Sequence, residues 1–163
     1  MDFLIRDYRP EDFLALWQLD QSCFPPGIAY SQLELRCYIR RPRAFAMLAE
    51  SRTANLNSAI LGFVVAEENR GIGHIITLDV GAAARRHGIA SALLGAAETR
   101  LCKEKCHTMR LETSVENFTA LRFYKHHGYD VIKTIPRYYS DGVDALLLQK
   151  NLLSPIAPAK LLK

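Results

Sequence analysis

The feature that most constrains the fold is a pair of strand patterns joined by one long helical pattern, between residues 74 and 114. HIITLDV at 74–80 is apolar and β-branched, as expected for a buried strand. Apolar residues then recur at helical spacing over 88–105, and TMRLETS at 108–114 alternates as a second strand. A strand, a helix and a returning strand form a crossover within one sheet, so we expect an α/β protein.

Similar patterns along the rest of the chain complete the predicted sheet. Further strands are expected at 3–8, 44–50, 59–68, 129–135 and 143–149, and further helices at 9–24, 31–41 and 117–128, with a polar turn at 51–58. Ser31 and Glu34 have the spacing of a capping box, and Gly128 is placed to end the last helix. The expected architecture is a mixed central sheet of about seven strands with helices on both faces.

Length and composition place these elements in one domain. The chain has 163 residues, of which 49% are hydrophobic and 23% charged, a balance typical of a folded globular protein. We expect the domain to occupy residues 1–150, and residues 151–163, with two prolines and no clear period, to form a loose tail. The first residues do not resemble a secretory signal, and no apolar run reaches the roughly 18 residues that cross a bilayer. A cytoplasmic protein without a membrane partner is expected, and its oligomeric state is left open.

Charge and cysteine content narrow the classes of ligand. The net charge of +4 suits a partner that carries phosphates, but the basic residues concentrate in two short, separate segments at 36–43 and 84–88. Domains that bind nucleic acid usually have a basic stripe interleaved with aromatic residues, so no direct binding of nucleic acid is expected. Cys102, Cys106 and His107 suggest a metal site, but no second ligand pair accompanies them. We favour two reduced thiols at a helix end, and no metal.

The loop before the helix at 88–105 has the composition of an anion-binding site. Arg85, Arg86 and His87 lead directly into Gly88, where the helix is expected to begin. The first turn of a helix presents unpaired N–H groups and a partial positive charge, and a glycine lets a phosphate approach the backbone. Arginines add charge-assisted hydrogen bonds. The loop predicts a cradle for a pyrophosphate; the alternative is an ordinary loop with solvated arginines.

The same loop resembles the acetyl-CoA loop of the GNAT acetyltransferases, whose motif is R/Q-x-x-G-x-G/A. Residues 85–90 read RRHGIA, and ITLDV precedes them where the family has its cofactor-binding strand. The similarity covers nearly the whole chain, although many relatives have a proline where this chain has GAAA. It implies the GNAT fold, acetyl-CoA as cofactor, and acetyl transfer to an amine by direct attack in a ternary complex. The resemblance assigns the cofactor to Leu78, Asp79, Val80, Arg85, Arg86, His87, Gly88, Ile89, Ala90, Ser91, Asn117 and Tyr124.

Residues 110–148 resemble the subgroup of this family that acetylates protein N-termini, ribosomal ones included. That resemblance implies that Glu112 is the general base, acting through water, and that Tyr124 is the general acid that protonates the departing thiolate. It also implies a peptide site formed by Phe24, Pro25, Tyr30, His74, Tyr138 and Tyr139. For His74 three interpretations stay open: a second base, a part of the peptide site, or an ordinary histidine at a strand end.

The residues themselves support these assignments in part. Asn117 and Tyr124 are seven residues apart, so they share one face of a helix. Glu112 lies near the end of a strand that we expect to be covered on both sides. Burying a charge there is costly unless the charge is paired, so its presence indicates a function. Each residue also has a purely structural interpretation: Asn117 as a helix cap, Tyr124 as a core aromatic, and Glu112 as the partner of Arg110.

The chemistry of amines bears on the choice of acceptor. Only a neutral amine attacks a thioester, and at pH 7 an α-amine with a pKa of about 8 loses its proton at a cost of roughly 1.4 kcal/mol, against about 4.6 kcal/mol for lysine. This favours the N-terminal α-amine of a protein as substrate. The alternatives are a small-molecule amine (a polyamine, amino acid or antibiotic) and a non-catalytic module that binds acyl-CoA.

Overall fold

The computed structural model describes residues 1–52 and 59–153, so most of the predicted turn at 51–58 and most of the predicted tail lie outside the described residues. The strands are β1 (Phe3–Asp7), β2 (Ala44–Ser51), β3 (Ile60–Asn69), β4 (Ile72–Val80), β5 (Thr108–Ser114), β6 (Asp130–Ile135) and β7 (Ala145–Asn151). The helices are α1 (Phe13–Cys23), α2 (Gln32–Ile39), α3 (Ile89–Lys103) and α4 (Phe118–His126). The predicted order of elements is confirmed.

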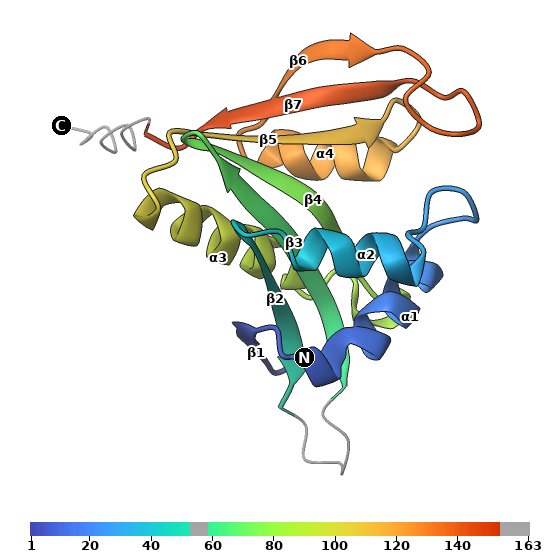
Figure 1. Cartoon of the computed structure of the whole chain (residues 1–163), viewed down its shortest axis with the longest axis vertical. Coiled ribbons are helices and arrows are strands. Elements are labelled where there is room, and N and C mark those ends of the chain that lie inside the picture. Colours follow the sequence, from blue (N-terminus) through green and yellow to red (C-terminus); the bar gives the residue numbers. More distant parts are fainter. Residues whose placement is uncertain (53–58, 154–163) are drawn as a thin grey trace, which may run out of the picture.

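The strands form one mixed sheet in the order β1-β2-β3-β4-β5-β7-β6 (Figure 1). All neighbours are antiparallel except β4 and β5, which are parallel. The helix α3 connects these two parallel strands, as the crossover pattern predicts. The predicted α/β class and the seven-stranded mixed sheet are therefore confirmed.

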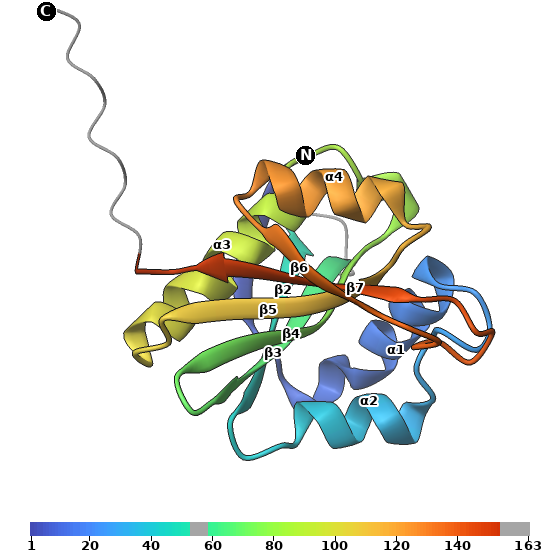
Figure 2. The ribbon, with the colours of Figure 1, turned by 90° about the horizontal axis from the view of Figure 1, so that it is seen from above.

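Helices cover both faces of the sheet, as Figure 2 shows, with α1 and α2 on one side and α3 and α4 on the other. The alternation of side chains along β2 and β3 divides the core in two. Ala46, Leu48 and Phe63 pack against α1 and α2, whereas Ala49 and Val64 belong to the cluster beneath α3. Both faces of these central strands are consequently buried.

The ends of the helices follow local signals in the sequence. Ser31 and Glu34 form the predicted capping box: Ser31 Oγ accepts from Glu34 N at 3.2 Å, and Glu34 Oε2 accepts from Ser31 N at 2.8 Å. The first helix begins later than expected, because Pro10–Asp12 form a separate 3-10 turn in which Asp12 accepts from Arg9 N at 2.8 Å. At the end of α4, Gly128 adopts the left-handed conformation, with φ +86°.

The sheet opens between β4 and β5. Their register covers three pairs, from Ile72 opposite Thr108 to His74 opposite Arg110, although β4 continues to Val80 and β5 to Ser114. A bulge where β3 faces residues 75–77 bends β4, while β5 stays paired with β7 up to Ser114. The two strands therefore diverge, and the backbone edge of each is turned towards the space between them.

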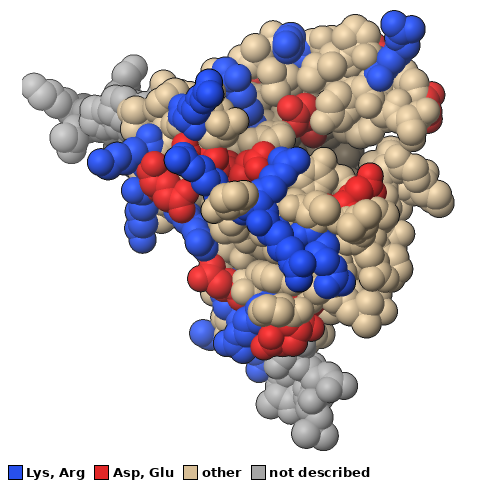
Figure 3. Space-filling view, viewed as in Figure 1, with Lys and Arg blue, Asp and Glu red and all other residues tan. Residues whose placement is uncertain are grey.

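Basic side chains gather in a band over α2 and its neighbourhood, interrupted by acidic ones (Figure 3). The four arginines of the segment at 36–43 are exposed, but Arg41 forms an ion pair with Glu67 at 2.9 Å and Arg43 forms one with Glu68. Neighbouring carboxylates thus neutralise half of this segment. The expectation that the protein does not bind nucleic acid stays a prediction.

Candidate active site

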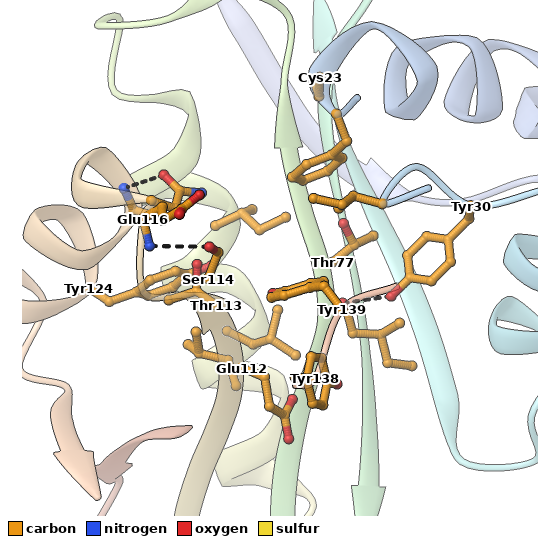
Figure 4. Close-up of a pocket in the computed structure, with 18 of the residues that line it drawn as sticks. Cys23, Tyr30, Thr77, Glu112, Thr113, Ser114, Glu116, Tyr124, Tyr138 and Tyr139 are labelled. Carbon is orange, nitrogen blue, oxygen red and sulfur yellow. Dashed lines mark hydrogen bonds between the residues drawn. The ribbon is translucent and has the colours of Figure 1, made fainter. Parts of the chain in front are cut away.

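A cavity of about 480 Å³ occupies the opening between β4 and β5 (Figure 4). Its walls come from both strands, from α4, from the loop between α1 and α2, and from the loop between β6 and β7. The predicted residues that line it are Phe24, Pro25, Tyr30, His74, Leu78, Glu112, Asn117, Tyr124, Tyr138 and Tyr139. The fold therefore brings together, from five separate segments, both predicted catalytic residues and the whole predicted peptide site.

Glu112 and His74 form a pair at one end of the cavity. His74 Nε2 lies 2.6 Å from Glu112 Oε2, and His74 Nδ1 lies 3.7 Å from Glu67 Oε1. Arg110 does not contact Glu112 but donates to Gln149 Oε1 at 2.7 Å. The interpretation of Glu112 as a partner for Arg110 is therefore wrong, and His74 is more than an ordinary residue at a strand end.

The pair also separates two cavities. A smaller cavity of about 340 Å³ adjoins the first, and His74 and Glu112 line both. Burial lowers the pKa of His74, but its hydrogen bond to Glu112 and the charges of Glu112 and Glu67 raise it further, so the net pKa is above its usual value. The hydrogen-bonded pair therefore connects the two cavities.

The expectation that both faces of β5 are covered is wrong. Met109, Leu111 and Thr113 are buried on one face, whereas Arg110 and Glu112 on the other are only partly buried. The reason is the divergence of β4 from β5, which leaves this face of β5 open to the two cavities. Glu112 thus keeps access to water, which a residue that exchanges protons with a substrate requires.

Tyr124 of α4 and Asn117, the residue that caps this helix, line the cavity, with Tyr124 beside Thr113 and Ser114 in Figure 4. Tyr124 is 7% exposed and packs edge-on against Tyr129. Burial, with a smaller effect of the charge of Asp79, raises the pKa of Tyr124, so the phenol keeps its proton and can only donate it. Asn117 Oδ1 accepts from Ala120 N at 3.1 Å, which confirms the helix cap and leaves the amide NH₂ as the group that could bind a ligand.

Two loops close the other side of the cavity with aromatic side chains. Tyr30, between α1 and α2, donates from its hydroxyl to Ile76 O at 3.4 Å. Tyr138 and Tyr139, between β6 and β7, pack edge-on with ring centres 5.0 Å apart. Ser140 Oγ donates to Gly27 O at 3.1 Å and so ties the two loops together. Two segments more than 100 residues apart in the chain thereby form one wall.

The N-terminus of α3, where the sequence predicts an anion site, is open. Gly88 is the N-cap residue with φ +78°, and no atom lies within 4 Å of the position that a Cβ would take there. Arg85, Arg86 and His87 are exposed around it, and Arg85 Nε donates to Val80 O at 3.1 Å. The GAAA segment, where relatives often have proline, forms a short 3-10 turn in which Ala84 is buried. The first-turn amides and the arginines fit a diphosphate.

The side chains of three predicted cofactor residues are engaged within the protein. The carboxyl of Asp79 is 1% exposed and points into the core rather than the cavity, so its predicted cofactor role does not extend to the side chain. Ile89 is a core residue at 1% exposure, which leaves only its backbone for a ligand. Ser91 Oγ lies 3.0 Å from His127 Nε2 and thus links α3 to α4.

The sequence did not indicate a further set of cavity residues. Tyr38 of α2 reaches the cavity from a helix, and Thr113 and Ser114 reach it from the end of β5. Alternation along β4 and β5 was the available signal, but it gives the face of a strand and not the place where two strands separate.

Cys23, Cys37, Cys102 and Cys106 are free thiols. Within residues 1–52 and 59–153, no group of three or more His, Cys, Asp or Glu could hold a metal ion, and no helix is long and apolar enough to cross a membrane.

Comparisons with known proteins point to one family. The sequence model of the acetyltransferase (GNAT) family matches residues 13–129. An uncharacterized N-acetyltransferase of Methanocaldococcus jannaschii is 32% identical over 149 residues, which cover 91% of each chain. The N-alpha-acetyltransferase daf-31 of Caenorhabditis elegans is 27% identical over 91% of this chain and 82% of its own.

Among solved structures, the ribosomal-protein-S18-alanine N-acetyltransferase of Escherichia coli superposes with a TM-score of 0.81, covering 93% of this chain and 94% of that one. Its sequence is 18% identical, so this likeness concerns the fold. The agreement over nearly the whole of both chains confirms the predicted fold.

Proposed function

The chain belongs to the GNAT acetyltransferase family, and we propose that its acceptor is the N-terminal α-amine of a protein. Membership gives the general reaction: an N-acetyltransferase that uses acetyl-CoA. The observation that supports a peptide acceptor is the composition of the acceptor wall. Aromatic rings predominate there, and among the residues lining the cavity only Glu112 and Glu116 carry carboxylates. A polyamine or an aminoglycoside, with several positive charges, would favour a more acidic wall.

The cofactor side depends on the backbone. The first-turn amides of α3 at Gly88, together with Arg85 and Arg86, would hold the diphosphate. The edge of β4 beyond His74, which is not paired with β5, offers backbone groups around Leu78 to the rest of the cofactor. Acetyl-CoA supplies a thioester that a neutral amine attacks and a thiolate that leaves. Backbone donors are suited to holding the cofactor because their positions are fixed before the cofactor binds.

Glu112 is proposed to take the proton that the attacking amine releases, through a bound water. His74, hydrogen-bonded to Glu112 at 2.6 Å, orients the carboxylate and passes the proton to the second cavity. The amine nitrogen thereby forms its bond to the acyl carbon without keeping a positive charge. One carboxylate working through water suffices for an α-amine with a pKa of about 8, whereas a lysine needs a stronger base.

Tyr124 is proposed to donate its phenolic proton to the sulfur as the carbon–sulfur bond breaks. Its raised pKa keeps the phenol protonated at neutral pH, and it lines the same cavity as Glu112 from a different element, α4 rather than β5. The two protons therefore travel by different routes: one leaves the amine through Glu112, and one reaches the sulfur from Tyr124. The phenol regains a proton from solvent after the product leaves.

The choice of acceptor is tested by release of free CoA with paired peptides. One peptide has a free N-terminus and no lysine, and its partner has an acetylated N-terminus and one internal lysine. We expect turnover of the first only, and a panel that varies the first two residues would define the preference. Turnover of the lysine peptide, or of a polyamine in place of both peptides, would contradict the proposal. Relatives named for acetylating a ribosomal protein make ribosomal N-termini the first ones to include.

A further inference from the structure

Two buried aspartates face each other directly behind the acceptor wall. Asp20 of α1 is 0% exposed and Asp79 of β4 is 1% exposed. Neither lines the cavity, but Cys23, Tyr30 and Thr77, which surround them, do. The reaction as described above uses neither carboxyl, although burying a carboxylate without a cation is costly. Such a pair requires an explanation.

The hydrogen bonds of the two carboxyls leave one oxygen of each for the other. Asp20 Oδ2 accepts from Tyr30 N at 2.8 Å and from Gln21 Nε2 at 3.3 Å, and Asp79 Oδ1 accepts from Thr77 Oγ1 at 2.6 Å. Asp20 Oδ1 and Asp79 Oδ2 are buried and have no hydrogen-bond partner among the described residues. A hydrogen bond between these two oxygens would satisfy both and needs one proton on the pair, in agreement with the effect of each carboxyl on the pKa of the other.

The surrounding groups place that proton on Asp79. Asp20 accepts from two N–H groups, which stabilise its negative charge, whereas Asp79 accepts from a single hydroxyl. Burial, opposed by the Thr77 hydroxyl and reinforced by the charge of Asp20, raises the pKa of Asp79 to about 8. At neutral pH, Asp79 Oδ2 therefore donates to Asp20 Oδ1, and the pair shares one negative charge.

We propose that the hydrogen bond from Asp79 to Asp20 is a positioning device that holds the acceptor loop at 24–30 against β4. Asp20 binds the backbone N–H of Tyr30, whose hydroxyl in turn donates to Ile76 O, so the loop is fastened to β4 at two points. Trp17 Nε1 also donates to Tyr30 O, at 3.1 Å. The name "acceptor loop" rests on the proposed function, but the attachment does not.

Other ionisable groups surround the pair. Cys23 lies on α1, Glu34 on α2 and Arg85 in the loop before α3, and Tyr124 approaches from α4. The pKa values of Cys23, Tyr30 and Tyr124 are all raised, chiefly by burial, so these groups stay neutral where Asp79 titrates. Above that pH, the two carboxylates repel each other, and the loop loses one of its two attachments to β4.

The first experiment needs no substrate. Trp17 is the single tryptophan of the chain, and its contact with Tyr30 makes its fluorescence a report on the loop. We expect a transition near pH 8 in the wild type and none in Asp79→Asn, whose amide donates to Asp20 at every pH. Thr77→Val should move the midpoint to higher pH, because the Thr77 hydroxyl lowers the pKa of Asp79. Cys23→Ser and His74→Asn should keep the wild-type transition.

The second experiment measures peptide KM against pH for wild type and Asp79→Asn with the same peptide, so that ionisation of the amine cancels in the ratio. If only the protonated pair holds the loop, the peptide KM of wild type divided by that of Asp79→Asn should rise about fivefold between pH 8 and pH 9. The KM for acetyl-CoA should change with pH equally in the two proteins. Asp79→Leu should show the high peptide KM at every pH. A wild-type fluorescence signal that stays flat from pH 6 to 10, or the same transition in Asp79→Asn, would overturn the proposal. If the fluorescence behaves as expected but no peptide is acetylated, the attachment holds and the proposed acceptor is wrong.

Discussion

The two sides of the cavity are built in opposite ways. The proposed cofactor side consists of a helix N-terminus, an unpaired strand edge and exposed arginines, all within residues 78–91, of which Leu78 lines the cavity. The acceptor side consists of side chains from α1, β4, β5 and two loops, held to each other by Ser140, Tyr30 and the buried aspartates. One side is a continuous segment that presents its backbone, and the other is assembled from distant parts of the chain.

This difference has a physical reason. Every acetyl-CoA carries the same diphosphate, which first-turn amides and arginines recognise wherever a strand is followed by a glycine-capped helix. The acceptor differs from one relative to another, so its recognition depends on side chains and on loops that can vary without disturbing the core. The four predictions below test whether the two sides work separately, beginning with the group that serves both.

The largest effect is expected at Tyr124, where the two sides meet. Tyr124→Phe keeps the buried ring and removes the proton, so kcat should fall by about 10² to 10⁴ while both KM values change little. Release of CoA measures this change. Tyr129→Phe is the matched control, since Tyr129 is equally buried but donates to Glu98 rather than lining the cavity. Equal rates in wild type and Tyr124→Phe would remove this phenol from the mechanism.

The next largest effect is expected on the cofactor side alone. Removing Arg86 by Arg86→Ala takes away a charge-assisted contact with the diphosphate and should raise KM for acetyl-CoA by about 10- to 100-fold, with peptide KM unchanged. Calorimetry with CoA should show the same loss, and added salt should reduce the difference. Arg52→Ala removes the same charge from an exposed site outside the cavity and serves as control. Unchanged binding of CoA by Arg86→Ala would contradict the predicted cradle.

A smaller effect is expected on the acceptor side, where the KM for the peptide should change instead of the KM for acetyl-CoA. Tyr139→Ala removes a ring that lines the cavity, so peptide KM should rise about tenfold, and KM for acetyl-CoA should stay the same. Tyr138→Ala, at a side chain that is 48% exposed, should have a weaker effect of the same kind. Initial rates with each substrate varied in turn separate the two KM values. If both variants use peptides as well as wild type does, the aromatic wall does not bind the substrate.

The smallest effect is a change in the pH profile. The pKa of His74 is raised, so its positive charge persists beside Glu112 to a higher pH than usual, and wild-type activity should rise only as that proton is lost. His74→Asn removes the charge and should move the acid limb of kcat/KM to lower pH. The profile should be measured with saturating acetyl-CoA. A limb that does not move, or moves to higher pH, would mean that His74 does not influence the base.

Much of the fold follows from the sequence because its signals are local. The capping box at Ser31, the cap at Asn117 and the glycine after α4 all act within a few residues, and the structure confirms each one. The late start of α1 was not foreseen, since Asp12 bonds to Arg6 of β1, a contact that only the folded sheet provides. Local rules cannot anticipate such contacts between elements.

The candidate site likewise has parts that local signals in the sequence predict and parts that depend on contacts between distant elements. The cradle at Gly88 and the pairing of Asn117 with Tyr124 on one helical face could be predicted from spacing. The partner of Glu112 could not, because spacing along β5 suggests Arg110, whereas His74 comes from a strand 38 residues earlier in the chain. Asp79 was assigned to the cofactor together with Leu78 and Val80, but those two side chains pack towards the cluster beneath α3, whereas that of Asp79 is buried on the other face of β4.

The sequence by itself therefore determined the order of strands and helices, because hydrophobic periodicity and helix-end chemistry operate over a few residues, and its motifs indicated the family. The tertiary structure decided where β4 and β5 separate, which carboxyl meets which histidine, and that two aspartates are buried behind the acceptor wall. These outcomes depend on how strands diverge and how loops meet across the cavity, which no stretch of sequence records by itself.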